Sequence, residues 1–163
     1  MEIVEATEQD IPTIHALAEQ IWWPTYRPIL SEEQISFMLK KMYSESALRE
    51  QMNSDVKFLL VKRENENVAF AGYSIEHGPA PILKIHKIYV LPTEQGKGTG
   101  KTLIEYLCNL AKDLNIPEVE LNVNRANPAF GFYQKVGFDI WETVDIPYYQ
   151  FVLNDYVMRK KVI

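Results

Sequence analysis

The stretch that decides the fold is Ile88-Tyr89-Val90-Leu91-Pro92-Thr93-Glu94-Gln95-Gly96-Lys97-Gly98-Thr99-Gly100-Lys101-Thr102-Leu103. It begins with an apolar run typical of a strand, passes through a glycine-rich turn and ends in a helical pattern. Glycines allow a tight turn and leave backbone N–H groups uncovered. A helix that starts there adds free N–H groups and the positive end of its dipole. The stretch therefore predicts a phosphate or pyrophosphate site, with a plain strand–helix turn as the alternative.

The spacing of the glycines separates the known phosphate-binding turns. A P-loop requires Gly-x-x-x-x-Gly-Lys-Ser/Thr, and Gly100-Lys101-Thr102 matches only its end, because position 95 is Gln. The dinucleotide motif requires Gly-x-Gly-x-x-Gly, whereas this turn reads Gly-x-Gly-x-Gly. The segment Gln95–Gly100 fits a third pattern, Gln/Arg-x-x-Gly-x-Gly/Ala.

A second motif lies further along the chain, in Asn127-Pro128-Ala129-Phe130-Gly131-Phe132-Tyr133-Gln134-Lys135-Val136-Gly137-Phe138. The two motifs together resemble the GNAT superfamily of acyl-CoA N-acetyltransferases, over about residues 56 to 160. The resemblance is loosely nearest to the small-amine and polyamine branch, through Tyr26 and the run Ile85-His86-Lys87-Ile88-Tyr89-Val90.

Composition limits the class of protein. The chain has 163 residues, with 47 % apolar and 24 % charged side chains, which is ordinary for one globular domain. No apolar run approaches about 18 residues, and the first residues show no signal peptide. The net charge of −5 argues against nucleic acid as a partner. Cys108 is the only cysteine, so no internal disulfide can form, and a cytoplasmic location with no membrane partner is the default expectation.

The periodicity of apolar residues predicts a single domain over residues 1–163, of α+β class with helices on the faces of a mixed sheet. The expected helices cover residues 8–22, 31 onward, 45–52, 98–114 and 127–136, and the expected strands cover 57–63, 68–76, 82–91, 118–124, 138–144 and 150–159. The first helix should break at Trp22–Pro28. The second should bury Ile35, Met38, Leu39 and Met42. The resemblance implies a mostly antiparallel GNAT-type sheet, split between its two central strands.

The resemblance implies acetyl-CoA as the co-substrate and no metal. Main-chain groups of Ile88, Tyr89 and Val90 would bond the pantetheine arm, although their side chains equally suit a core. The turn would hold the pyrophosphate through Gln95, Gly96, Lys97, Gly98, Thr99, Gly100, Lys101 and Thr102. Asn127, Phe130, Tyr133 and Lys135 are further candidates for cofactor contact. Asn127 also suits a helix cap, and both lysines of the turn and Lys135 also suit a solvated surface.

Tyr133 is the candidate general acid. Transfer of an acetyl group to an amine expels a thiolate, which benefits from a proton donor at sulfur. A core aromatic is the alternative role. The candidate base is His86, where GNAT enzymes often have a Glu, or else Glu76 at the end of the second long strand.

The acceptor pocket should include at least one of the aromatics Trp22, Trp23, Tyr26, Tyr148 and Tyr149, because aromatic faces hold cations. The tryptophans could instead fasten the first helix to the sheet. The leading hypothesis is direct attack of a small amine on acetyl-CoA in a ternary complex. A non-catalytic acyl-CoA-binding module and a protein or peptide N-acetyltransferase are the alternatives. A homodimer is compatible with the resemblance.

Overall fold

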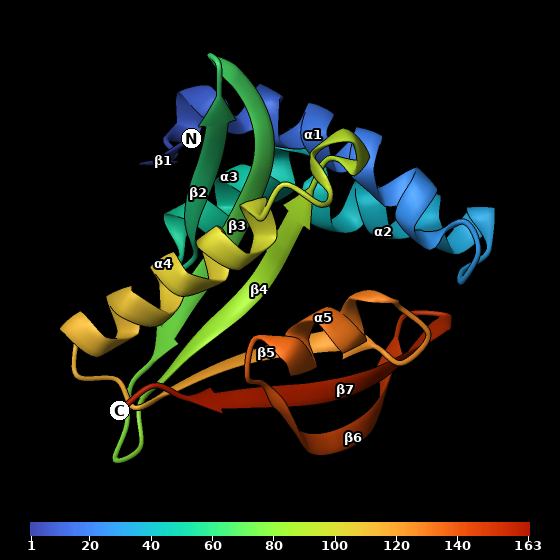
Figure 1. Cartoon of the computed structure of the whole chain (residues 1–163). Coiled ribbons are helices and arrows are strands. Elements are labelled where there is room, and N and C mark those ends of the chain that lie inside the picture. Colours follow the sequence, from blue (N-terminus) through green and yellow to red (C-terminus); the bar gives the residue numbers. More distant parts are fainter. The chain divides into compact units, whose positions relative to one another are not determined.

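The computed structural model describes residues 1–163 and confirms the α+β class (Figure 1). In chain order the elements are β1 (Glu2–Glu5), α1 (Ile11–Tyr26), α2 (Glu32–Tyr43), α3 (Glu45–Asn53), β2 (Lys57–Arg63), β3 (Glu66–Glu76), β4 (Ile82–Val90), α4 (Thr99–Asp113), β5 (Glu118–Asn124), α5 (Ala129–Lys135), β6 (Asp139–Tyr148) and β7 (Phe151–Lys161).

The strands follow the order β1-β2-β3-β4-β5-β7-β6, and most neighbouring pairs are antiparallel. The exception is the parallel pair β4 and β5. These strands pair only over Ile82–Ile85 and Glu118–Leu121. The expected split between the two central strands therefore begins where this short ladder ends.

The chain divides into two compact units. Unit 1 comprises Met1–Ser74 and Lys87–Leu103, and unit 2 comprises Ile75–His86 and Ile104–Ile163. The prediction of a single domain stays a prediction. No helix is both long enough and apolar enough to cross a membrane.

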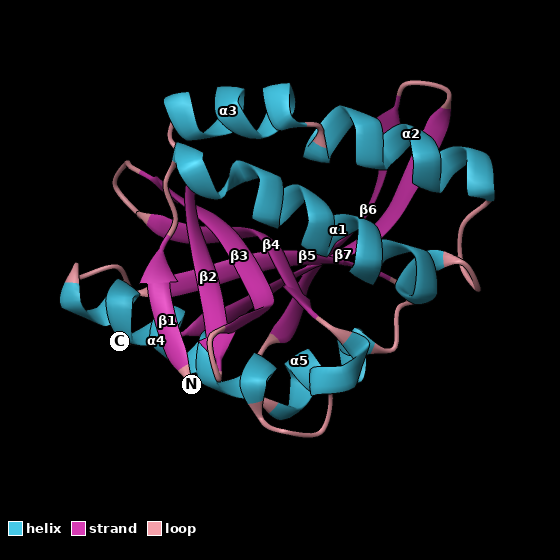
Figure 2. Ribbon diagram, turned by 90° about the horizontal axis from the view of Figure 1, so that it is seen from above, coloured by secondary structure: helices cyan, strands magenta, loops and turns pink.

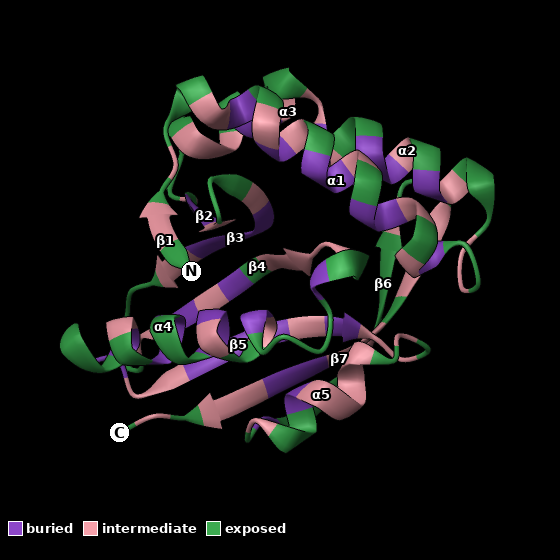
Figure 3. Ribbon diagram, turned by 45° about the horizontal axis from the view of Figure 1, so that its top comes forward, coloured by how far each residue is buried: buried purple, intermediate pink, exposed green.

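Unit 1 is a layer of three helices on the β1–β3 part of the sheet. Figure 2 shows α1 running beside both α2 and α3. Helix α1 places Ile14, Leu17 and Ile21 on its buried face, and β2 and β3 are buried along most of their length (Figure 3). A capping box starts this segment, in which the Thr7 N–H donates to the Asp10 carboxylate at 2.9 Å.

Unit 2 has its core between helices and the strands β5 and β7. Val119, Leu121 and Val123 alternate along β5 with polar residues, as the period of two in the sequence predicts. Helix α5 packs on β5 (Figure 1). Cys108 lies on the buried side of α4, where 6 % of it is exposed.

Helix α1 corrects one expectation, since it continues through Pro24 to Tyr26 rather than breaking at Trp22. Proline lacks the N–H that would bond the carbonyl one turn earlier. The Thr25 hydroxyl donates to the Ile21 carbonyl at 2.7 Å and supports the backbone at this point. Trp22 and Tyr26 are both buried one turn apart, so packing outweighs the missing bond.

Two smaller expectations were also incomplete. The strand β1 was not predicted, because four residues carry too little periodicity, and it forms by pairing with β2. In α2 the buried position near the C-terminus is Tyr43, which is 1 % exposed, whereas Met42 is only half-buried.

Candidate active site

The glycine turn of unit 1 joins β4 to α4 (Figure 1). Gly96 and Gly98 have φ angles of +84° and +79°, in the left-handed region that favours glycine. A Cβ atom placed on either residue would meet no atom within 4 Å. The turn therefore presents its backbone to open space, and glycine is required there by conformation and not by crowding.

The start of α4 supplies hydrogen-bond donors beside this open backbone. The Thr102 N–H donates to the Gly98 carbonyl at 3.0 Å and closes the first helical turn. The N–H groups of Thr99 and Gly100 precede that bond, and helix geometry gives them no acceptor one turn earlier. Free N–H groups and the positive helix end together favour an anion. The residues present thus fit the pyrophosphate of acetyl-CoA.

A buried carboxylate lies directly beneath the turn. Glu94 is 4 % exposed and accepts hydrogen bonds from Arg63 Nε at 2.6 Å and from Thr99 Oγ1 at 3.0 Å. Arg63 Nη2 in turn donates to Thr99 Oγ1 at 3.3 Å, so the three side chains close a ring. The hydrogen bond from Arg63 holds the pKa of Glu94 below its usual range, against the opposing effect of burial.

The candidate phosphate ligands of the turn differ in what their side chains already contact. Lys97 Nζ lies 3.2 Å from the second oxygen of Glu94, and half of its side chain is exposed. Lys101 is exposed. The Thr102 hydroxyl donates to the Gly98 carbonyl at 3.0 Å. The hydroxyl of Thr99 faces Glu94, so for Thr99 the candidate group is the backbone N–H.

Tyr133 lies in unit 2, on the short helix α5. It is 7 % exposed, and its ring contacts Phe132 and Phe138, with centroids 5.4 Å and 6.1 Å away. The Asn127 side chain accepts from the Ala129 N–H at 2.9 Å, as a capping side chain does at a helix start. The acid role of Tyr133 stays a prediction.

The other candidates on or near α5 lie toward its surface. The Phe130 ring packs on Tyr156, with centroids 4.9 Å apart, and Lys135 is exposed. Both candidate bases, His86 and Glu76, also belong to unit 2 and are exposed. The choice between these two bases stays a prediction.

The predicted acceptor aromatics fall into separate groups. Trp22, Tyr26 and Tyr89 gather in one cluster of unit 1, where the Tyr26 and Tyr89 hydroxyls are 2.8 Å apart and the Trp22 and Tyr26 ring centroids 4.4 Å. The Tyr148 and Tyr149 rings of unit 2 lie at the β6–β7 turn, with centroids 5.1 Å apart.

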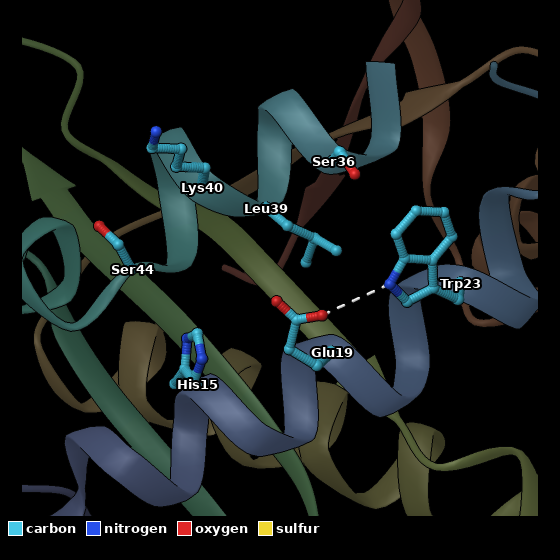
Figure 4. Close-up of a pocket in the computed structure, with 7 residues that line it drawn as sticks. All are labelled: His15, Glu19, Trp23, Ser36, Leu39, Lys40 and Ser44. Atoms are coloured by element: carbon cyan, nitrogen blue, oxygen red, sulfur yellow. Dashed lines mark hydrogen bonds between the residues drawn. The ribbon is translucent and has the colours of Figure 1, made fainter. Parts of the chain in front are cut away.

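Trp23 lies apart from that cluster, at a hollow of about 230 Å³ between α1 and α2 (Figure 4). Its indole N–H donates to Glu19 at 3.4 Å. His15, on the same hollow, bonds the Tyr43 carbonyl through Nδ1 at 2.7 Å. These polar groups already have protein partners.

Sequence reasoning missed two charged residues of unit 1. In the sequence, Glu94 resembles an exposed turn residue. Its partner Arg63 lies 31 positions earlier, so no local pattern in the sequence predicts their contact. Lys87 reads as a surface position of a strand, yet its ammonium lies 5.1 Å from the ring centre of the buried Tyr43. Burial lowers the pKa of Lys87 to about 8.

Comparison with known proteins agrees with this geometry. A spermidine N(1)-acetyltransferase of Thermoplasma acidophilum is 30 % identical over 99 % of this chain and 97 % of its own length. The crystal structure of a PaiA N-acetyltransferase from the same organism, in complex with coenzyme A, has a TM-score of 0.83 at 30 % identity and covers 98 % of each chain. A peptidyl-lysine N-acetyltransferase, YjaB of Escherichia coli, is 32 % identical over 51 % of this chain and 49 % of its own length.

The acetyltransferase (GNAT) family profile matches residues 16–138. This match includes the glycine turn and all of α5, the two segments that carry the sequence motifs. Most of the chain is therefore explained by one family, and this protein belongs to the GNAT family of acetyltransferases.

Proposed function

We propose that this N-acetyltransferase transfers the acetyl group of acetyl-CoA to a primary amine of a small molecule, with a polyamine as the first candidate. The open, donor-rich glycine turn carries the proposal, because it suits the pyrophosphate of the acetyl donor. The similarity to a spermidine N(1)-acetyltransferase over nearly the full length supports the choice of a polyamine.

The reaction proceeds by direct attack in a ternary complex. The neutral amine nitrogen forms a bond to the thioester carbonyl carbon, and the carbon–sulfur bond breaks as the tetrahedral intermediate collapses. Tyr133 donates its phenolic proton to the departing sulfur. The surplus proton of the amine passes to His86 or to Glu76, directly or through water, and Tyr133 is reprotonated from solvent. The products are the N-acetylated amine and coenzyme A.

The charge of the chain suits such an acceptor. A net charge of −5 attracts a polycation over a distance of about a Debye length. A peptide acceptor is the second candidate, favoured by the shorter similarity to a peptidyl-lysine N-acetyltransferase. A non-catalytic acyl-CoA-binding module is the third.

One acetylation screen separates these functions. The chain is incubated with acetyl-CoA and, in turn, spermidine, spermine, an aminoglycoside, a free amino acid and a lysine-containing peptide, and mass spectrometry detects each product. Acetylated spermidine or spermine is the expected result. Acetylation of the peptide alone would replace the proposed acceptor, and binding of acetyl-CoA with no product would favour the non-catalytic module.

The pH dependence identifies the base. If His86 accepts the proton, kcat/KM should rise with pH in the range in which histidines lose their charge, and His86→Ala should remove this rise. A rise that persists in His86→Ala and disappears in Glu76→Gln would assign the role to Glu76. A rise that survives both changes would mean that the amine arrives already neutral.

A further inference from the structure

Arg63, Glu94 and Thr99 form a closed ring of side-chain hydrogen bonds at the glycine turn. We propose that this ring, the turn clamp, is a positioning network that holds the glycine turn in the conformation that binds the pyrophosphate of acetyl-CoA. The proposal rests on the assignment of the turn as the pyrophosphate site.

The clamp joins the two ends of the turn to a strand. Glu94 immediately precedes Gln95, the first residue of the turn, and Thr99 is the first residue of α4. The Thr99 hydroxyl donates to Glu94 at 3.0 Å, which ties the start of the turn to its end. Arg63, the last residue of β2, anchors both through bonds of 2.6 Å and 3.3 Å.

The turn needs such an anchor because its own backbone is held by few bonds. Between Glu94 and Gly98 the turn has one backbone hydrogen bond of its own, from the Lys97 N–H to the Glu94 carbonyl at 3.3 Å. Gly96 and Gly98 have no side chain to pack, and glycine has the largest conformational freedom to lose. A phosphate-binding turn that is already ordered avoids this loss at binding, which improves affinity.

The charge of Glu94 allows an experiment to separate the effect of the turn clamp from simple repulsion between Glu94 and the pyrophosphate. A carboxylate beside a pyrophosphate repels it, so removal of the charge alone should strengthen acetyl-CoA binding. Removal of the clamp should weaken binding. The two effects have opposite signs, and Glu94→Gln therefore tests which of them dominates.

The experiment measures the Kd of acetyl-CoA by calorimetry and its KM and kcat for three variants. Glu94→Gln and Thr99→Val should each raise Kd and KM by about tenfold, the effect of one lost charge-assisted hydrogen bond, with kcat within about twofold. Thr99→Ser keeps the hydroxyl and should restore Kd to the wild-type value. Thr99→Val changes no charge and leaves the contact between Lys97 and Glu94 in place.

The matched control is Glu120→Gln in unit 2. Glu120 is also a buried carboxylate bonded by two cations, Lys84 and Arg159, both at 2.8 Å. This variant should lose a comparable amount of stability and keep the Kd of acetyl-CoA unchanged. A rise in Kd in the control equal to that in Glu94→Gln would show a general loss of stability and would overturn the proposal.

Two further results would also contradict the clamp. Tighter binding by Glu94→Gln would mean that Glu94 acts only as a repelling charge. Unchanged Kd in Thr99→Val would mean that the ring stabilises the fold without positioning the turn. In both cases wild-type binding of acetyl-CoA keeps the pyrophosphate assignment intact, whereas failure of the wild-type chain to bind acetyl-CoA would remove the proposed function itself.

Discussion

The hydroxyl of Tyr133 can be tested without disturbing the packing around it. In Tyr133→Phe the ring keeps its contacts with Phe132 and Phe138, and the Kd of acetyl-CoA should not change. Loss of the proton donor should lower kcat by about 10²-fold, the usual scale of general acid catalysis. Steady-state kinetics and calorimetry provide the two measurements.

Tyr156 offers the control for this change. It is a second tyrosine of unit 2, whose ring packs on Phe130, and Tyr156→Phe should leave kcat unchanged. Equal kcat values in the wild type and in Tyr133→Phe would make Tyr133 a packing residue only.

Lys87 makes stability depend on pH in a predictable direction. Its pKa of about 8 lies below the ordinary value of 10.5, so the folded state binds fewer protons than the unfolded state between these two pH values. Stability therefore rises with pH through this window, and the cost of burying the ammonium is fully present below pH 8. Lys87→Met should raise the free energy of unfolding at pH 7 by ~1–3 kcal/mol and remove the rise.

Urea unfolding at pH 7 and at pH 10 measures this effect. Lys57→Met is the control, because Lys57 begins β2 and is exposed. A loss of stability in Lys87→Met at pH 7 would show that the contact between the ammonium and the Tyr43 ring outweighs the cost of burial.

The proline inside helix α1 allows a test of what stabilises this helix. Pro24 leaves one carbonyl of the helix without its usual donor, and the residue itself is exposed, so Pro24→Ala should restore the bond without loss of packing. We expect a gain of about 1 kcal/mol, smaller than the intrinsic propensity difference because alanine also loosens the unfolded chain. Pro12→Ala, in the first turn of the same helix, should give no gain, because an N–H there has no helical acceptor.

Denaturant unfolding of both proline variants provides the comparison. A gain in Pro12→Ala equal to that in Pro24→Ala would show that the restored hydrogen bond is not the cause of the gain. A loss in Pro24→Ala would show that the restored bond does not outweigh the greater freedom of the unfolded chain.

The elements themselves were largely predictable from the sequence. The strands at residues 57–63 and 118–124 have the predicted limits, because the apolar run of the first and the alternation of apolar and polar residues in the second both end at turn residues. The limits of α1 were wrong, since packing of Trp22 and Tyr26 overrides the local effect of proline. The contact between Arg63 and Glu94 could not be predicted, because it joins two segments whose pairing only the folded sheet determines.

For the whole molecule, buried carboxylates in both units predict sensitivity to acid. The hydrogen bond from Arg63 lowers the pKa of Glu94. Burial alone would raise the pKa of Glu120, but the bonds from Lys84 and Arg159 outweigh burial and lower it. Both groups have folded pKa values below the ordinary 4.5, so their stabilisation is present above that pH and is lost as pH falls through the folded values.

Unfolding followed by circular dichroism from pH 7 to pH 2 should show this loss. Glu120→Gln should lower the stability at pH 7 and flatten its fall below pH 4.5. Glu142→Gln, at an exposed position of β6, should retain the wild-type profile. Identical acid profiles for the wild type and Glu120→Gln would mean that other groups control acid unfolding.

The seclusion of Cys108 has a practical consequence. Burial raises the pKa of its thiol, so little of the reactive thiolate forms at neutral pH. Acetyl transfer liberates a different thiol, that of coenzyme A, and colorimetric thiol reagents can therefore follow turnover against a nearly silent protein background. Conversely, the slow rate at which a thiol reagent labels Cys108 would measure how often the buried side of α4 opens spontaneously.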